Sequence, residues 1–128
     1  MSWFKKKKAN PERDEFKKQF ESVITSLNQA NRIARIAVGH SINMANSIFL
    51  KNYNNVEEFQ KASREEQFEY LNRLSMLEKQ MWSEDQMTSI GVGLFKMWLC
   101  AAMENDGELL SLFSKEVAKL SKDGDLSV

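Results

Sequence analysis

The sequence predicts an all-α protein: a helical bundle of four main helices, with room for one further short helix, around a long N-terminal helix. Three observations favour this fold class. Apolar and small residues recur at alternating steps of four and three along residues 16–48, which is the spacing of a helix face that packs lengthwise on other helices. Capping residues precede each later apolar pattern. Five glycines and one proline leave little material for hairpin turns.

The first helix is predicted to begin at Asn10-Pro11-Glu12, which supplies an N-cap, a proline at the first helical position and an acidic first turn. Its seam keeps one phase, so we expect this helix to reach Leu50 or Lys51. The seam consists of Phe16, Phe20, Val23, Leu27, Ala30, Ala34, Ala37, Ser41, Met44 and Ile48. The residues expected on the solvent side of the same helix are Lys18, Thr25, Arg32, Gly39 and Asn46.

The length of this helix poses a choice. At 1.5 Å per residue it spans about 60 Å, whereas a compact monomer of this size is roughly 36 Å across. Either the helix breaks near Gly39 and folds back as an antiparallel pair, or it stays whole and a second copy covers its overhang. The unbroken phase favours a continuous helix. It therefore predicts a homodimer whose interface is formed by Phe16, Phe20, Val23, Leu27, Ala30, Ala34 and Ala37.

Later helices follow recognisable start signals. Ser63 and Glu66 have the spacing of a capping box, residues 83–86 repeat that pattern, and Asn105-Asp106-Gly107 marks a turn. The expected helices after the first are a short one near 56–59, one from 63 to about 82, one from about 84 to 103, and one that ends near 122.

Length and composition indicate a single domain. The 128 residues suffice for one core. We expect that domain to comprise residues 11–122, between a basic and aromatic tail at 1–10 and a polar tail at 123–128. Eighteen basic and eighteen acidic side chains cancel, so no overall field attracts nucleic acid, and no nucleic-acid partner is expected.

The sequence also bears on the compartment. Cys100 is the one cysteine, so the fold needs no disulfide and no oxidising environment. No apolar stretch follows the lysines at 5–8, as a secretory signal would require. The apolar run Ile90–Met103 contains Lys96 and is shorter than the ~20 residues that span a bilayer. We therefore expect a cytoplasmic protein in which this run is a buried core helix.

No motif for catalysis, a cofactor or a metal is recognisable. His40 is the one histidine, and Ala37 stands where a di-iron Glu-x-x-His motif would have its glutamate. His40 and Cys100 are the remaining candidates for nucleophilic chemistry, but nothing in the sequence brings them together. Gly91-Val92-Gly93 lacks the third glycine of a dinucleotide fingerprint, and we expect it to permit close helix approach or a bend. An enzyme is not expected.

The N-terminal segment joins two aromatic rings to a run of cations. Its residues are Trp3, Phe4, Lys5, Lys6, Lys7 and Lys8. Such a segment favours weak, reversible contact of residues 1–8 with an anionic membrane, although a passive solvated tail is the plainer interpretation. Ser2 stands where myristoylation needs glycine. Similar basic starts occur in many bacterial proteins.

These patterns predict a non-enzymatic small cytosolic helical protein that acts through protein–protein interaction. We expect it to self-associate through the first helix, to bind another protein, or both, as an accessory or immunity-type binding protein does. Two alternatives stay open. Seven methionines and eight phenylalanines could line a core that holds an apolar ligand or lipid, and the N-terminal segment could make the protein a peripheral membrane adaptor.

Overall fold

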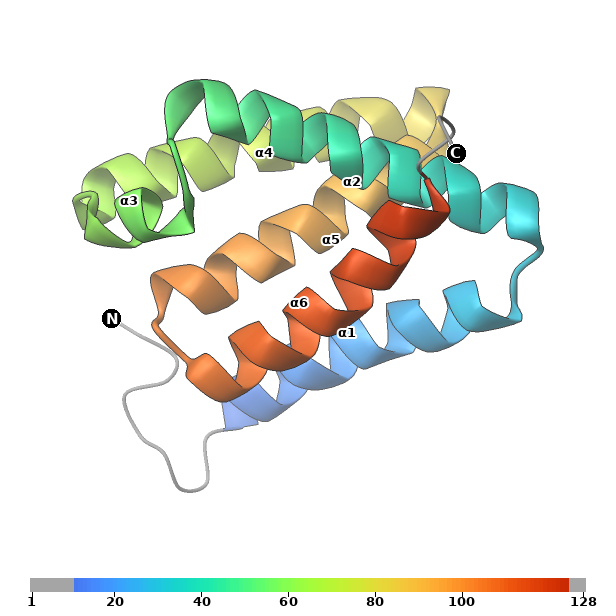
Figure 1. The fold of residues 1–128 in the computed structure, drawn as a ribbon, viewed down its shortest axis with the longest axis horizontal. Helices are drawn as coiled ribbons and strands as arrows, with labels where there is room; N and C mark the ends of the chain where they lie inside the picture. Colours follow the sequence, from blue (N-terminus) through green and yellow to red (C-terminus); the bar gives the residue numbers. More distant parts are fainter. Residues whose placement is uncertain (1–10, 125–128) are drawn as a thin grey trace.

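The computed structural model describes residues 11–124, and the regular secondary structure in that range is entirely helical (Figure 1). The all-α fold class is thus confirmed. The helices are α1 (Pro11–Gln29), α2 (Arg32–Asn52), α3 (Val56–Lys61), α4 (Arg64–Glu84), α5 (Gln86–Met103) and α6 (Gly107–Asp123). The predicted tail at 1–10 and residues 125–128 lie outside the described range.

Helix α5 is the centre of the fold. It packs against α2, α3, α4 and α6, and Figure 1 shows it running behind α6 through the middle of the molecule. Val92, Leu94, Phe95 and Leu99 are buried along it, which confirms the expectation of a buried core helix. Between residues 11 and 124, no helix combines the length and the apolar character that a membrane span requires.

The chain turns between α1 and α2, so the prediction of one continuous helix to Leu50 is wrong. Asn31 is the N-cap of α2, and its side-chain oxygen accepts a hydrogen bond from the Ala34 backbone N–H at 2.8 Å. The Arg35 guanidinium donates to the Ala30 carbonyl at 2.7 Å and so caps the end of α1. The break lies at residues 30–31 and not near Gly39. Figure 1 shows α1 and α2 meeting at this corner, with α6 between them.

The spacing of the seam residues continues across the corner, but its two halves have different surroundings. In α1, Phe16 and Phe20 pack on α6, and the rings of Phe20 and Phe113 stack with centroids 3.7 Å apart. In α2, Met44 and Ile48 of the predicted seam are exposed. The buried side of α2 is instead formed by Val38, Ser41, Ile42, Ala45 and Phe49. The long N-terminal helix as the bundle centre is therefore replaced by α5.

Capping signals located the start of α4 correctly, whereas the cap of α5 is Asp85 and not Ser83, which is the last-turn residue of α4. Asn55 caps α3 and Ser63 caps α4, each accepting from the backbone N–H three residues on. Asp106 caps α6 in the same way, and Asp85 caps α5 through two backbone N–H groups. These side chains satisfy N–H groups that a helix start leaves without partners.

An aromatic cluster joins four helices at one end of the bundle. Its members are Phe49, Tyr53, Phe59, Tyr70 and Phe95, from α2 and the residue after it, α3, α4 and α5. Neighbouring ring centroids lie 5.1–6.0 Å apart, mostly in edge-to-face arrangement. The short helix α3 is held in the fold through this cluster.

Two glycines allow helix backbones to touch. A Cβ at Gly91 would lie 2.5 Å from the Ser41 Cβ and 2.8 Å from the Val38 carbonyl oxygen, so α5 and α2 meet there. A Cβ at Gly39 would lie 1.8 Å from the Leu120 carbonyl oxygen, where α2 meets α6. The close approach predicted at Gly91 is confirmed. The solvent-facing position predicted for Gly39 is wrong, since Gly39 is buried.

We expect Gly91→Ala to lower the free energy of unfolding by about 1–2 kcal/mol, because overpacking against the α2 backbone outweighs the gain in helix propensity. Chemical denaturation monitored by circular dichroism measures the change. Gly107→Ala is the matched control. Gly107 is also helical, as the first residue of α6, but a Cβ there would meet no heavy atom within 4 Å. This substitution should therefore leave the free energy of unfolding unchanged or slightly higher.

An ion pair ties the start of α1 to the start of α6. Arg13 Nε lies 2.6 Å from Asp106 Oδ2, and Arg13 Nη2 lies 2.6 Å from Glu108 Oε1. The Asp106 side chain is 11% exposed and also caps α6 through the Leu109 backbone N–H. The Arg13 guanidinium is the main reason that the pKa of Asp106 lies below its ordinary value of 3.8.

Asp106→Asn should keep the cap but lose the charge, and we expect it to cost about 1–2 kcal/mol at pH 7. A lowered carboxyl pKa stabilises the fold above the ordinary pKa and ceases to do so as pH falls through the folded value. The difference between the two proteins should therefore shrink below about pH 4. Denaturation midpoints across pH 3–7 measure it. Glu69→Gln, in the exposed pair with Arg73, should cost at most about 0.5 kcal/mol. An equal loss in both variants would contradict the assignment.

Candidate functional site

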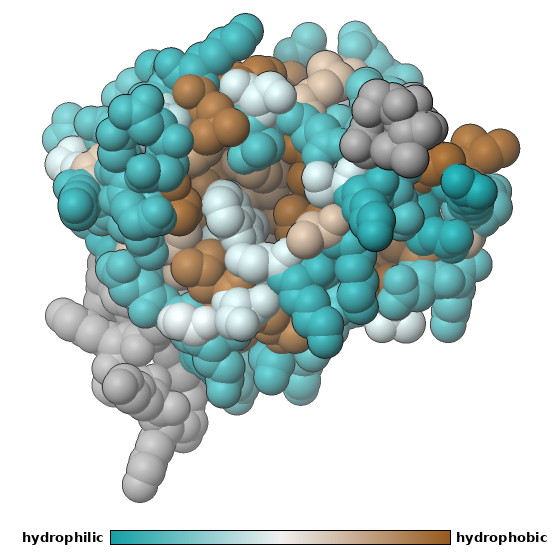
Figure 2. All heavy atoms as spheres, in the orientation of Figure 1, coloured by the Kyte–Doolittle hydropathy of each residue, from teal (hydrophilic) through white to brown (hydrophobic). Residues whose placement is uncertain are grey.

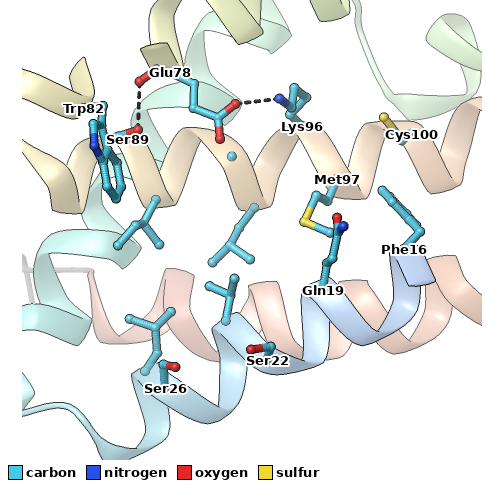
Figure 3. Close-up of a pocket in the computed structure, with 15 residues that line it drawn as sticks. Phe16, Gln19, Ser22, Ser26, Glu78, Trp82, Ser89, Lys96, Met97 and Cys100 are labelled. Carbon is cyan, nitrogen blue, oxygen red and sulfur yellow. Dashed lines mark hydrogen bonds and ion pairs between the residues drawn. The ribbon is translucent and has the colours of Figure 1, made fainter. Parts of the chain in front are cut away.

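A groove of about 630 Å³ lies between α1 and α5 and reaches the end of α4 (Figure 3). This volume falls within the range of small-molecule sites. The lining residues are Phe16, Gln19, Ser22, Val23, Ser26, Leu27, Glu78, Trp82, Ser89, Ile90, Gly93, Leu94, Lys96, Met97 and Cys100.

The groove exists because α1 is held by helices other than α5. Helix α1 packs on α6 and on α2, whereas the close neighbours of α5 are α2, α3, α4 and α6. Figure 3 shows α1 and α5 running side by side across the open space, with Phe16 beside Cys100 at one end and Ser26 opposite Ser89 at the other. The two helices are thus antiparallel along the groove. Each contributes eleven residue steps, or about 16 Å of length.

Polar groups gather where α4 meets α5. Lys96 Nζ lies 2.5 Å from Glu78 Oε1 and donates to Ser75 Oγ at 3.2 Å. The Ser89 hydroxyl donates to the Glu78 carbonyl at 2.8 Å. A Cβ at Gly93 would lie 2.5 Å from Glu78 Oε2, so the missing side chain leaves room for the carboxylate. Lysine and glutamate cancel each other's charge on the α4 side of the groove.

The catalytic candidates from the sequence are not brought together. Cys100 lines the groove, and burial raises the pKa of its thiol to about 11. At neutral pH it is protonated, whereas nucleophilic attack requires the thiolate. His40 is exposed on α2 and does not line the groove. Residues 11–124 contain no cluster of three or more His, Cys, Asp or Glu side chains placed to hold a metal ion.

Cys100 should react slowly with Ellman's reagent. A pKa near 11 leaves about a hundredfold less thiolate at pH 8 than an ordinary cysteine has. Because Cys100 is the one cysteine, the absorbance change reports it directly. The native protein should react about a hundredfold more slowly than the urea-unfolded protein. Equal rates would mean that the thiol is not held in an apolar environment.

A second candidate surface is the outer face of α2, defined here as Ile33, Ala37, His40, Met44 and Ile48. These residues recur at steps of three and four and share one side of the helix. Ile33 is 79% exposed, Met44 51% and Ile48 45%. Isolated apolar residues are normal on a surface, but three large ones in a line form a stripe.

A smaller hollow of about 180 Å³ lies between α2, α5 and α6. From the side of Figure 1 the surface is largely hydrophilic, with hydrophobic atoms visible in its middle (Figure 2). Hydrogen bonds join α6 to both neighbours here, from Trp98 Nε1 to Ser114 Oγ at 2.7 Å and from Asn43 Nδ2 to the Ser121 carbonyl at 3.0 Å. Its volume is below the range of small-molecule sites, so we interpret it as a packing defect.

The structure divides the predicted interaction residues into three groups. Phe16, Phe20 and Leu27 are buried in the core, and Val23 lines the groove. Ala30, Ala34 and Ala37 are half-buried at the corner and along α2. The remaining ones, Trp3, Phe4, Lys5, Lys6, Lys7 and Lys8, lie outside the described residues.

Sequence reasoning missed Glu78, Trp82 and Lys96 as parts of the groove. A lysine inside the apolar run 90–103 was the available signal, because a cation on a core helix needs a partner. Nothing in the sequence indicated that this partner is Glu78 of α4.

Comparison of the chain with protein-family models, with curated proteins and with solved structures finds no match. The groove and the outer face of α2 are therefore the features from which a function can be inferred.

Proposed function

We propose that the protein is a non-enzymatic binding protein that acts through contact with another protein, and that the outer face of α2 is its contact surface. The observation that carries this proposal is the exposed line of Ile33, Met44 and Ile48. Fifteen residue steps separate its ends, or about 22 Å, which suits an amphipathic helix of the partner. An accessory or immunity-type protein that neutralises another protein is one form of this function.

The charge of α2 favours an acidic partner. Helix α2 carries Arg32, Arg35, His40 and Lys51 and contains no Asp or Glu. Arg35 is engaged at the corner with Ala30, whereas Arg32 and Lys51 are exposed at the two ends of the helix. A partner helix with apolar residues along its centre and carboxylates at both ends complements this arrangement.

Self-association is the second candidate. The α1 half of the predicted dimer interface is occupied within the fold, so a dimer through the first predicted helix would have to use the outer face of α2. An antiparallel pair of α2 helices would place Arg32 of one copy near Lys51 of the other, and this like-charge contact disfavours it. Membrane contact through residues 1–8 and the cytoplasmic location stay predictions from the sequence.

A designed helical peptide tests the proposal. It carries leucines at steps of four and three and glutamates at both ends, and its counterpart has lysines in place of the glutamates. We expect the acidic peptide to bind at least tenfold more tightly by fluorescence anisotropy. Met44→Glu should weaken that binding about tenfold, since it places a like charge in the apolar line.

Met76→Glu, which alters an exposed methionine on α4, is the control and should bind normally. Equal binding of both peptides, or equal loss in both variants, would contradict the proposal. Light scattering on the same samples decides the second candidate: a dimer that Met44→Glu dissociates would show that a second copy occupies this face.

A further inference from the structure

We propose that the groove between α1 and α5 binds a single unbranched hydrocarbon chain, which lies along the two helices with its polar end in solvent. The ligand class is therefore an alkyl or acyl amphiphile. This site is separate from the outer face of α2, and the proposal does not depend on the protein-contact function.

The dimensions of the groove select this occupant. The groove is elongated, since its volume of about 630 Å³ extends along about 16 Å of α1 and α5. A hydrocarbon chain touches carbon atoms on either side at about 3.5–4.0 Å, so one extended chain can contact both walls along this length.

The lining matches such a chain along its whole length. Helix α1 contributes Phe16, Val23 and Leu27, and α5 contributes Ile90, Leu94 and Met97. Apolar side chains thus stand on both walls, and Met97 adds an adaptable thioether at the Cys100 end. The α1 residues Gln19, Ser22 and Ser26 are exposed and form a polar rim. A chain can therefore bury its methylenes while its head group stays hydrated.

The charges at the groove do not select a head group. Lys96 is held by the Glu78 carboxylate at 2.5 Å and by the Ser75 hydroxyl at 3.2 Å, so it offers no net charge to a ligand. A ligand carboxylate that bound Lys96 would have to displace Glu78. The Glu78 carboxylate lies against α5 in the space that Gly93 leaves open. We therefore expect the protein to recognise the hydrocarbon chain of the ligand and not its head group.

Isothermal titration calorimetry with decanoate, decanol and decyltrimethylammonium, each below its micelle-forming concentration, tests the proposal. We expect the three dissociation constants to agree within about tenfold. Affinity should rise about two- to fourfold with each methylene between six and ten carbons, as expected for chain burial. Absence of binding by all three compounds would overturn the proposal.

Two substitutions on α1 locate the site. Val23→Trp fills the groove and should weaken decanol binding at least tenfold. Asn28→Trp is the matched control, since Asn28 is exposed, does not line the groove and lies about 140° around the helix from Val23. Ser26→Trp introduces the same ring from the exposed rim and should also weaken binding, which keeps the test valid if Val23→Trp fails to fold.

Equal affinity of wild type and both groove variants would place the ligand elsewhere and overturn the assignment. A decanoate affinity more than a hundredfold above that of decanol, lost in Lys96→Met, would show recognition of an anion and overturn the chain-only mechanism. Loss of binding in Asn28→Trp would also contradict it.

Discussion

The rest of the structure depends on how closely α2 approaches α5. An apolar helix at the centre of a small bundle is stable only if neighbours cover it on most sides. Gly91 has no Cβ that would collide with α2, and Gly39 has none that would collide with α6. Helices α2, α5 and α6 therefore form a tightly packed unit. Helix α4 packs along α5 at least as extensively. The aromatic cluster holds α3 in the fold, and the phenylalanine stack holds α1.

The groove is a consequence of this packing order. Phe16 and Phe20 turn toward Phe113, and Arg13 pairs with Asp106, so α1 is fixed along its α6 side. Phe16 lies at the edge of that contact and also begins the groove, while the flank bearing Val23 and Ser26 looks across to α5. Between Phe16 and Leu27, the α1 residues that line the groove are Gln19, Ser22, Val23 and Ser26. The two serines and the valine are too short to reach across to α5.

Local signals in the sequence were enough to place most helices. The caps at Asn55, Ser63 and Asp106 act through hydrogen bonds within three residues, and such contacts can be recognised without knowing the fold. The corner at Ala30–Asn31 has the same kind of cap, at Asn31, but this signal lies inside a continuous apolar pattern and was not recognised. No glycine or proline marks it, and the seam runs through it in phase, because α1 presents this line to α6 and the groove whereas α2 presents part of it to solvent. Only the excess of helix length over molecular diameter pointed to a break.

The candidate site was harder to predict than the fold, since it is made of long-range pairs. Lys96 and Glu78 are eighteen residues apart, and Phe16 and Cys100 come from opposite ends of the chain. Once assembled, these polar groups have structural partners: Glu78 holds Lys96, Asp106 holds Arg13, and burial keeps Cys100 protonated. The groove and the outer face of α2 differ from these pairs, because both expose apolar side chains to solvent. Contact with apolar groups is therefore one way in which these surfaces can gain free energy.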